Sequence, residues 1–180
     1  MTVPRPATSF AGRAIAVLTG SAAVALGLDQ LTKHLAVVHL TDHEPVKLLG
    51  GGVYLLLTRN SGAAFSLGSD YTFVFPAITL AVVGWIAWMA RRLVSVPWAV
   101  ALGLVLGGAL GNFVDRLFRA PGPFVGHVVD FVSLFDRNGQ GWPVFNVADM
   151  SLVGGVALAI LLELTGRRRD GTRVTTDDGS

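Results

Sequence analysis

Long apolar stretches alternate with polar, glycine-rich segments along this chain of 180 residues. Four stretches, at about residues 14–34, 71–90, 97–116 and 145–165, are apolar enough to cross a membrane, and a spanning helix needs about 20 such residues. Pro97 stands where the third helix would begin, a position that suits proline. The pattern predicts an all-α polytopic membrane protein with four transmembrane helices.

The first stretch has a second interpretation. Arg13, the apolar run that follows it and the small residues around Ala25 also resemble a cleavable signal peptide. The apolar pattern does not end at Leu28, however, but continues through residues 31–38, where Lys33 could extend its charge toward the interface. This continuation favours a first span that stays in the protein.

The connection between the first and second stretches predicts a small β element. Two apolar runs, residues 46–49 and 53–58, flank the three glycines at 50–52, which is typical of a hairpin or small sheet. The segment is too short and apolar to fold alone, so we expect it to lie against the membrane surface. The second long connection, residues 117–144, is rich in glycine and proline and is expected to be a loop.

Composition supports a membrane protein. The chain is 52% hydrophobic and 14% charged, against roughly a quarter charged in soluble domains, and its mean hydropathy is +0.58. A net charge of +2 is too small to indicate a nucleic-acid partner. The absence of cysteine excludes disulfides, thiolate catalysis and zinc sites built on cysteine.

Arginines predict the orientation of the four spans. Their clusters fall at one end of the spans: Arg5, Arg13, Arg91, Arg92 and Arg167 to Arg169. Because basic residues concentrate on the cytoplasmic side, both termini are expected in the cytoplasm and the β element outside. Residues 1–12 are then a cytoplasmic segment, residues 13–166 a single membrane-embedded domain and residues 167–180 a disordered cytoplasmic tail.

Two aspartates that lie close to the ends of apolar stretches are the first candidate catalytic residues. Asp130 lies in a Val-Val-Asp-Phe run, and Asp149 ends a Phe-Asn-Val-Ala-Asp run. Carboxylates near bilayer depth are costly and indicate function. The chain has neither an HExxH motif nor a serine-centred elbow, so a water-activating carboxylate pair is favoured. Asp149 alone could instead cap a helix N-terminus.

Five short motifs extend this reading: Asp29-Gln-Leu-Thr-Lys33, Asn60-Ser-Gly-Ala-Ala-Phe65, Gly111-Asn-Phe-Val-Asp-Arg116, Val128-Val-Asp-Phe131 and Phe145-Asn-Val-Ala-Asp149. In this order on a four-span chain they resemble the lipoprotein signal peptidase (signal peptidase II) family, over about Leu28 to Leu162. The resemblance implies a bacterial intramembrane aspartic endopeptidase with Asp130 and Asp149 as its catalytic pair.

The same resemblance implies the substrate and setting. The enzyme would remove signal peptides from diacylglyceryl-modified prolipoproteins, cutting before the lipidated cysteine with water activated by the two aspartates. Its partners would be these substrates and membrane lipid, and it would act as a monomer in the bacterial cell membrane with its active site outside. No cofactor and no metal are expected. The connection at 117–129 is longer than in short family members, which puts substrate contacts there in doubt.

Residues near the end of the third stretch are candidate supporting groups. Asn112 and Arg116 are four residues apart and share a helix face. They could orient a carboxylate, or bind the substrate backbone or a lipid phosphate. Alternatively, Arg116 could pair with its neighbour Asp115, itself part of the third motif, or anchor the helix at the membrane interface.

The remaining candidates also have structural alternatives. Asn60 and Asn146 could bind substrate backbone or cap helices. Asp29 and Lys33 are spaced as an i, i+4 pair and could be an interfacial ion pair. Glycines at 103, 107, 108 and 111, and at 154 and 155, predict close packing between the third and fourth helices and their neighbours.

One competing function uses the same carboxylates. A small proton-coupled transporter could relay protons through Asp29, Asp130 and Asp149. Such a relay should run through the full membrane depth, yet the inner halves of the predicted spans carry only Glu163. This favours a one-sided active site.

Overall fold

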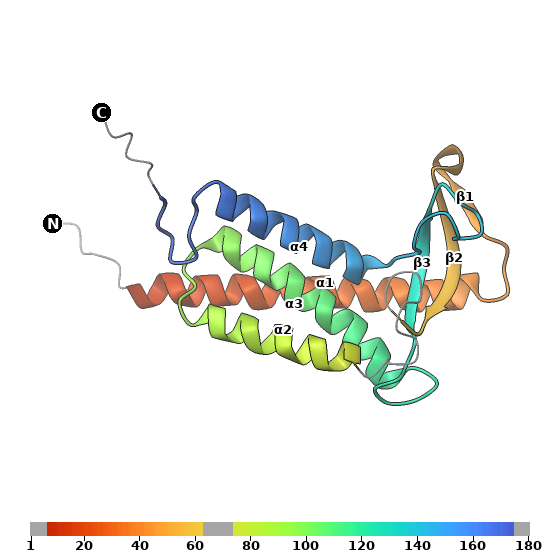
Figure 1. The fold of residues 1–180 in the computed structure, drawn as a ribbon, viewed down its shortest axis with the longest axis horizontal. Helices are drawn as coiled ribbons and strands as arrows, with labels where there is room; N and C mark the ends of the chain where they lie inside the picture. The colour runs from red at the N-terminus through yellow and green to blue at the C-terminus, as the bar shows by residue number, and fades with distance from the viewer. Residues whose placement is uncertain (1–6, 63–73, 175–180) are drawn as a thin grey trace.

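The computed structural model describes residues 7–62 and 74–174. Four helices lie alongside one another, and a three-stranded sheet stands across one end of them (Figure 1). The helices are α1 (Ala7–Leu40), α2 (Val74–Ala90), α3 (Val96–Phe118) and α4 (Val147–Leu164). Within the described residues, α1, α3 and α4 are long and apolar enough to cross a membrane, and α2 is a shorter apolar helix. The protein is therefore mostly helical, with a small sheet.

The first helix is longer than predicted: α1 runs from Ala7 to Leu40 and so extends past both ends of the predicted span, residues 14–34. Its buried residues follow one another at spacings of four, four and three, namely Ala14, Leu18, Ala22, Ala25, Asp29, Lys33, Ala36 and Leu40. This spacing keeps side chains on a single helix face. Cleavage near Ala25 would remove half of that packed face, so the structure favours a retained helix over a signal peptide.

Glycines let α3 approach its neighbours closely. A Cβ added at Gly103 or Gly107 would lie 2.6 Å from a backbone carbonyl oxygen of α1, and one at Gly155 of α4 would lie 2.7 Å from a carbonyl oxygen of α3. No atom lies within 4 Å of a Cβ added at Gly154. Cβ atoms added at Gly108 and Gly111 would each lie 2.5 Å from an oxygen atom of α4 and of α1, respectively. The prediction of close glycine packing is therefore wrong for Gly154 and confirmed for the other five glycines.

The sheet contains the predicted hairpin and one further strand. Strands β1 (Val46–Leu48) and β2 (Val53–Asn60) pair antiparallel, and β3 (Val128–Leu134) pairs with the other edge of β2. The expectation that Asp130 lies on a loop is wrong, because it lies on β3 opposite Thr58. The physical reason is the apolar run around it, which is buried on both faces of the strand and so lacks an alternating pattern.

The chain after α4 also differs from expectation. Residues 167–174 form a turn in which Arg167 bridges Arg173, and the carbonyl of Arg169 accepts hydrogen bonds from the amides of Val94 and Ser95. The prediction of a disordered tail is therefore wrong for residues 167–174, and residues 175–180 lie outside the described part of the chain.

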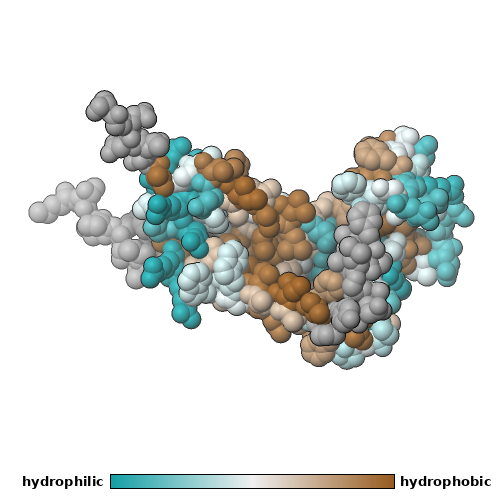
Figure 2. All heavy atoms as spheres, in the orientation of Figure 1, coloured by the Kyte–Doolittle hydropathy of each residue, from teal (hydrophilic) through white to brown (hydrophobic). Residues whose placement is uncertain are grey.

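The surface shows where lipid would contact the protein. Apolar side chains form a broad band over the helices, with hydrophilic residues gathered at both ends (Figure 2). Several large apolar side chains on α4 are exposed, among them Val153 and Leu164. This distribution fits a protein embedded in a bilayer.

Candidate active site

Asp130 lies almost fully buried on β3 at the junction of the sheet and the helices. Its Oδ2 accepts a hydrogen bond of 3.0 Å from Nδ2 of Asn60, and its Oδ1 accepts one of 2.6 Å from Nδ2 of Asn146. Asn60 ends the neighbouring strand β2, so strand pairing brings the first of these donors to Asp130. Both carboxylate oxygens are thus held by fixed amides.

Asp149 lies in the first turn of α4, facing the same region. Asn146 caps this helix: its Oδ1 accepts a hydrogen bond of 3.0 Å from the amide of Asp149, and the amide of Asn146 donates to Oδ2 of Asp149 over 3.1 Å. This reciprocal arrangement is a capping box. The structural alternative foreseen for both residues is therefore confirmed, and it coexists with a place in the site.

Asn146 connects the two aspartates directly. Its side-chain oxygen and backbone amide bind Asp149, while its side-chain Nδ2 donates to Asp130. The same Nδ2 lies 3.2 Å from Oδ1 of Asn112 and 3.3 Å from the carbonyl of Val129. One buried asparagine thus fixes the positions of both aspartates relative to each other.

Asn112 of α3 supports the second carboxylate. Its Nδ2 donates to Oδ1 of Asp149 over 2.9 Å, and its Oδ1 accepts a hydrogen bond of 2.9 Å from Nζ of Lys33. Because Lys33 can only donate, it fixes which end of the Asn112 amide faces Asp149.

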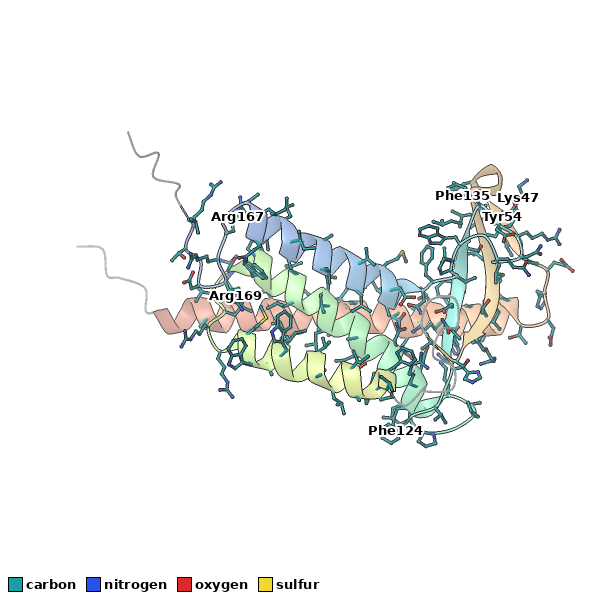
Figure 3. The ribbon with its side chains drawn as sticks, in the orientation of Figure 1. Lys47, Tyr54, Phe124, Phe135, Arg167 and Arg169 are labelled. Atoms are coloured by element: carbon teal, nitrogen blue, oxygen red, sulfur yellow. The ribbon has the colours of Figure 1, made fainter. Side chains whose placement is uncertain are left out.

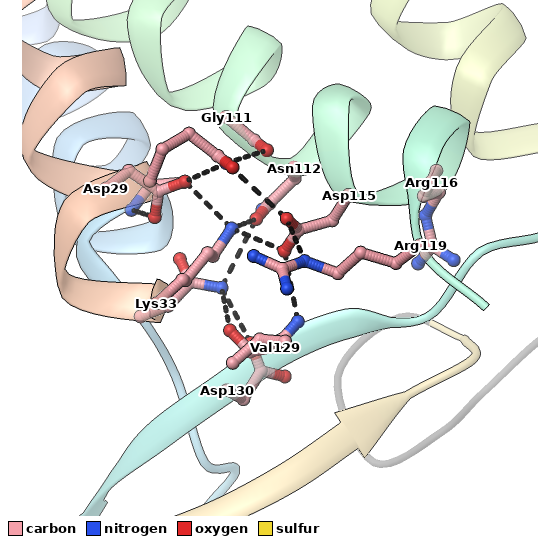
Figure 4. Close-up of polar contacts among 12 residues, drawn as sticks. Asp29, Lys33, Gly111, Asn112, Asp115, Arg116, Arg119, Val129 and Asp130 are labelled. Carbon is pink, nitrogen blue, oxygen red and sulfur yellow. Dashed lines mark hydrogen bonds and ion pairs between the residues drawn. The ribbon is translucent and has the colours of Figure 1, made fainter. Parts of the chain in front are cut away.

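A fully buried charge cluster lies behind this amide (Figure 4). Lys33 Nζ lies 2.8 Å from Oδ2 of Asp29 and 3.0 Å from Oδ2 of Asp115. Asp115 also accepts hydrogen bonds from Arg119 Nε and from the amide of Val129, over 2.6 Å and 3.1 Å. The expected pair of Asp29 with Lys33 is confirmed, but as part of a buried network that ties α1, α3 and β3 together.

Arg116 has a different role from the ion pair considered for it. Its guanidinium donates to the carbonyls of Ser61, Gly62 and Gly126 and lies 4.4 Å from the centroid of the Phe75 ring. Asp115 pairs with Lys33 and Arg119 instead. Arg116 therefore holds the chain just after β2 against the end of α3.

Two contributors were not singled out from the sequence. Gln30 donates to the carbonyl of Gly111 over 3.0 Å and to Asp29 over 3.1 Å. Arg119 pairs with Asp115, and their i, i+4 spacing is a signal that could have found this contact. Residues 63–65, the end of the second motif, lie outside the described residues.

A cavity of about 460 Å³ opens beside the two aspartates. Polar groups line one side of it, namely Asn60, Asn112, Arg116, Asp130 and Asp149. Apolar side chains of α2, α3 and α4 line the other, including Ile78, Val82, Phe113 and Leu152. The cavity thus places a pair of carboxylates at the edge of an apolar groove.

The environment of Asp130 favours its protonated form. Burial and, to a lesser extent, the nearby charge of Asp149 raise the pKa of this carboxyl to about 7, although the hydrogen bonds from Asn60 and Asn146 act to lower it. A carboxyl that keeps its proton near neutral pH can donate it, while a partner carboxylate can accept one from water. The pair can therefore perform general acid-base hydrolysis.

The chain matches a known family model over most of its length. The model described as signal peptidase (SPase) II matches residues 21–165. Among curated proteins, the lipoprotein signal peptidase of Mycobacterium avium (strain 104) is 53% identical over 154 residues, which are 86% of this chain and 82% of the relative. The lipoprotein signal peptidase of Rhodococcus jostii (strain RHA1) is 48% identical over 94% of this chain and 82% of its own length.

Solved structures share the fold. A bacterial membrane enzyme determined by the in meso method at 2.3 Å resolution superposes with a TM-score of 0.70 at 27% identity, over 92% of this chain and 95% of that one. A second bacterial membrane enzyme, determined by the same method at 1.9 Å, gives a TM-score of 0.68 at 29% identity, over 85% and 93%. The helices and the sheet are thus arranged as in enzymes of bacterial membranes.

Proposed function

Because the chain belongs to the signal peptidase II family, a family of proteases, we propose that Asp130 and Asp149 are the catalytic pair with which it removes signal peptides from prolipoproteins. The observation that carries this assignment is the bridge through Asn146, whose side-chain Nδ2 donates to the carboxylate of Asp130 and whose backbone amide donates to the carboxylate of Asp149, beside one cavity. No other pair of carboxylates lines that cavity among the described residues.

The two aspartates divide the chemistry. Asp149, whose side-chain oxygens accept hydrogen bonds from Asn112 and from the Asn146 amide, takes a proton from water as the water oxygen attacks the scissile carbonyl carbon. Asp130, whose pKa is raised to about 7, donates a hydrogen bond to the carbonyl oxygen and supports the tetrahedral intermediate. The carbon–nitrogen bond then breaks as the proton held by Asp149 passes to the leaving amine.

Asn60 and Asn112 keep this arrangement fixed. Each presents an amide nitrogen to one catalytic carboxylate, from β2 and from α3 respectively. Because both side chains lie on regular elements, the carboxylates lose little freedom when substrate binds. The buried cluster of Asp29, Lys33 and Asp115 supports the site from behind and does not reach the cavity.

The topology that fits this role has four spans. The apolar helix α2, of 17 residues, lies beside α3 as the remaining span, and residues 13–166 form a single membrane-embedded peptidase domain. The arginine clusters then place both termini in the cytoplasm, with residues 1–12 as a cytoplasmic segment. The sheet and the cavity face outside the bacterial cell membrane. One chain contains every group proposed for catalysis, which supports a monomer.

The substrate is a prolipoprotein whose cysteine already carries diacylglyceryl. The apolar wall of Ile78, Val82 and Leu152 adjoins the catalytic pair and can hold acyl chains that enter from the lipid. The peptide would lie along the polar side, where Asn60 and Arg116 line the cavity, so that the bond before the lipidated cysteine meets the aspartates.

A proton-coupled transporter fits the structure less well. Asp130 on β3 and Asp149 in the first turn of α4 lie on elements that meet at the end of the bundle that carries the sheet, whereas Glu163 lies near the opposite end of α4 (Figure 1). The helical segments between these two levels, residues 7–28, 74–110 and 150–162, contain no aspartate or glutamate. A proton would find no titratable carboxylate across that distance.

Cleavage of a defined substrate tests the function. The full chain, purified in detergent, is incubated with diacylglyceryl-modified prolipoprotein, and the product masses are measured. We expect cleavage before the lipidated cysteine, which chelators leave unchanged. Loss of cleavage with a chelator, or equal cleavage by an Asp130→Asn variant, would contradict the aspartic mechanism.

A further inference from the structure

Four arginines line a cavity at the end of the bundle away from the two aspartates. Arg91 and Arg92 follow α2, and Arg168 and Arg169 follow α4. The cavity measures about 640 Å³, and its other lining residues are Trp88, Met89, Glu163 and Asp170. Four guanidinium groups against two carboxylates leave an excess of two positive charges. Figure 3 shows Arg169 at this end, far from Lys47 and Tyr54 on the sheet.

The backbone holds both arginine pairs in place. The carbonyl of Arg169 accepts hydrogen bonds of 2.9 Å and 3.0 Å from the amides of Val94 and Ser95. The carbonyl of Arg167 accepts one of 2.7 Å from Nε1 of the buried Trp98. The turn after α4 is thereby fixed against the turn after α2. The cavity between the two turns is part of the folded protein and not a chance meeting of mobile tails.

Among the described residues, no ion pair within 4.0 Å neutralises the four cavity arginines, although the charge of Arg168 does act on Asp170. In the described part of the chain, the four ion pairs involve Lys33, Arg119 and Arg137, and none involves the cavity arginines. The Oδ1 atom of Asp170 accepts hydrogen bonds from the amide and hydroxyl of Thr172, over 2.9 Å and 2.7 Å. Clustered guanidinium groups repel one another, and a bound phosphate, which arginine binds through paired N–H donors, would offset that repulsion.

Apolar side chains border the same cavity. Trp88 and Met89 line it, and Trp88 is 61% exposed. Leu164 does not line the cavity, but it directly follows the lining residue Glu163 in the last turn of α4 and is 81% exposed. The hydrophilic cluster at this end meets the apolar band of the helices directly (Figure 2). A ligand with a phosphate and long apolar chains matches both surfaces at once, whereas a free anion would match only the first.

We propose that this cavity binds the phosphodiester headgroup of an anionic phospholipid, with the acyl chains lying along the exposed apolar faces of α2 and α4. Basic pockets between transmembrane helices bind such headgroups. The site lies at the opposite end of the bundle from the peptidase cavity, so lipid binding there is measured independently of cleavage.

Native mass spectrometry of the full chain in detergent tests the lipid preference. The protein is titrated with dioleoyl phosphatidylglycerol and, separately, with dioleoyl phosphatidylcholine, which has the same acyl chains but a zwitterionic headgroup. We expect one phosphatidylglycerol to bind about 10-fold more tightly or better, since the two excess positive charges favour an anion. Equal binding of the two lipids would overturn the proposal. Full displacement of the bound lipid by glycerol 3-phosphate would also overturn it, because the site would then hold a small anion.

A matched pair of double variants locates the site. Arg91→Gln with Arg168→Gln removes one cavity arginine from each turn. Arg13→Gln with Arg173→Gln removes the same charge from exposed residues that do not line the cavity. Each basic residue near an anionic lipid contributes about fivefold in affinity, so the first variant should bind phosphatidylglycerol about 30-fold more weakly and the second almost normally. Equal losses in both would overturn the proposal. If the first double variant does not fold, Arg168→Gln alone is compared with Arg173→Gln.

Discussion

The carboxylate of Asp29 accepts a hydrogen bond of 2.8 Å from the backbone amide of Ala148, across 119 residues of sequence. Ala148 directly precedes Asp149, so a side chain in the middle of α1 holds the first turn of the helix that carries a proposed catalytic residue. The amide belongs to the helix N-terminus, where a carboxylate is favoured. Asp29 thus acts on the site by positioning α4.

Gly111→Ala should disturb this contact. A Cβ added at Gly111 would lie 2.5 Å from Oδ2 of Asp29 and 3.1 Å from Cβ of Ala148. Overpacking of this kind costs about 1–3 kcal/mol, so the variant should unfold at lower temperature and cleave more slowly. Gly154→Ala is the matched control, because no atom lies within 4 Å of its new Cβ, and alanine is about 1 kcal/mol better than glycine inside a helix. A Gly111→Ala enzyme with normal stability and rate would show that α1 does not position α4.

Lys33→Met should destabilise the protein more than any exposed substitution. The variant leaves the carboxylates of Asp29 and Asp115 buried without their shared cation. Removing one partner from a buried ion pair costs about 3–5 kcal/mol. Lys47→Met, at an exposed position of β1, should change stability little. Adding Asp29→Asn to Lys33→Met should recover part of the loss in thermal unfolding, and a double variant worse than the single one would argue against charge burial as the cause.

Several features of this site could be predicted from the sequence because they depend on local spacing. The apolar stretches predicted the helices, the glycine-separated runs predicted the β1–β2 hairpin, and the i, i+4 spacing of Asp29 and Lys33 predicted their pair. Their surroundings could not be predicted in the same way. The burial of Lys33 depends on Asp115 and Asn112, which approach it only through the packing of α3 on α1.

The position of Asp130 shows the limit most clearly. Both faces of β3 are buried, so its segment does not alternate between apolar and polar residues. Without that alternation, its valines and phenylalanine cannot be told apart from the apolar residues of a loop. Pairing with β2, about 70 residues earlier in the chain, decides that this segment is a strand. Long-range pairing of this sort leaves little local signal.

Asp130 should make the protein less stable as pH rises toward neutrality. Burial and the charge of Asp149 raise the pKa of Asp130 from 3.8 to about 7 in the folded state. Between those values the folded protein holds a proton that the unfolded chain releases, so this contribution is complete below about pH 4 and is lost as pH rises through about 7. Asp130→Asn should flatten that dependence in thermal unfolding measured across this range. An unchanged slope would show that Asp130 ionises normally.

Replacing either proposed catalytic aspartate, Asp130 or Asp149, by asparagine should abolish turnover while the protein still folds. Asparagine keeps the size of the side chain but cannot carry the proton, and general acid-base catalysis contributes roughly 10²- to 10⁴-fold. Asp42→Asn is the matched control, because Asp42 is exposed and has a φ of 58°, which asparagine also tolerates. Product is measured by mass with each purified variant. A rate above about a hundredth of the wild-type value in Asp130→Asn or Asp149→Asn would remove that residue from the mechanism.

The diacylglyceryl group on the substrate should raise the kcat/KM of cleavage. The cavity beside the aspartates has an apolar wall formed by Ile78, Val82, Phe113 and Leu152, and each buried CH₂ group contributes roughly 0.8 kcal/mol. Binding energy from acyl chains remote from the scissile bond can be used to position that bond. We therefore expect a much higher kcat/KM for diacylglyceryl-modified prolipoprotein than for the same chain with an unmodified cysteine.

Two matched variants test whether the apolar wall is responsible. Val82→Asp, which places a charge on that wall, should reduce the ratio of kcat/KM between the lipidated and the unmodified substrate. Val153→Asp, on the exposed face of α4, should leave this ratio unchanged. Equal kcat/KM for the two substrates in the wild-type enzyme would show that the acyl chains bind elsewhere or not at all.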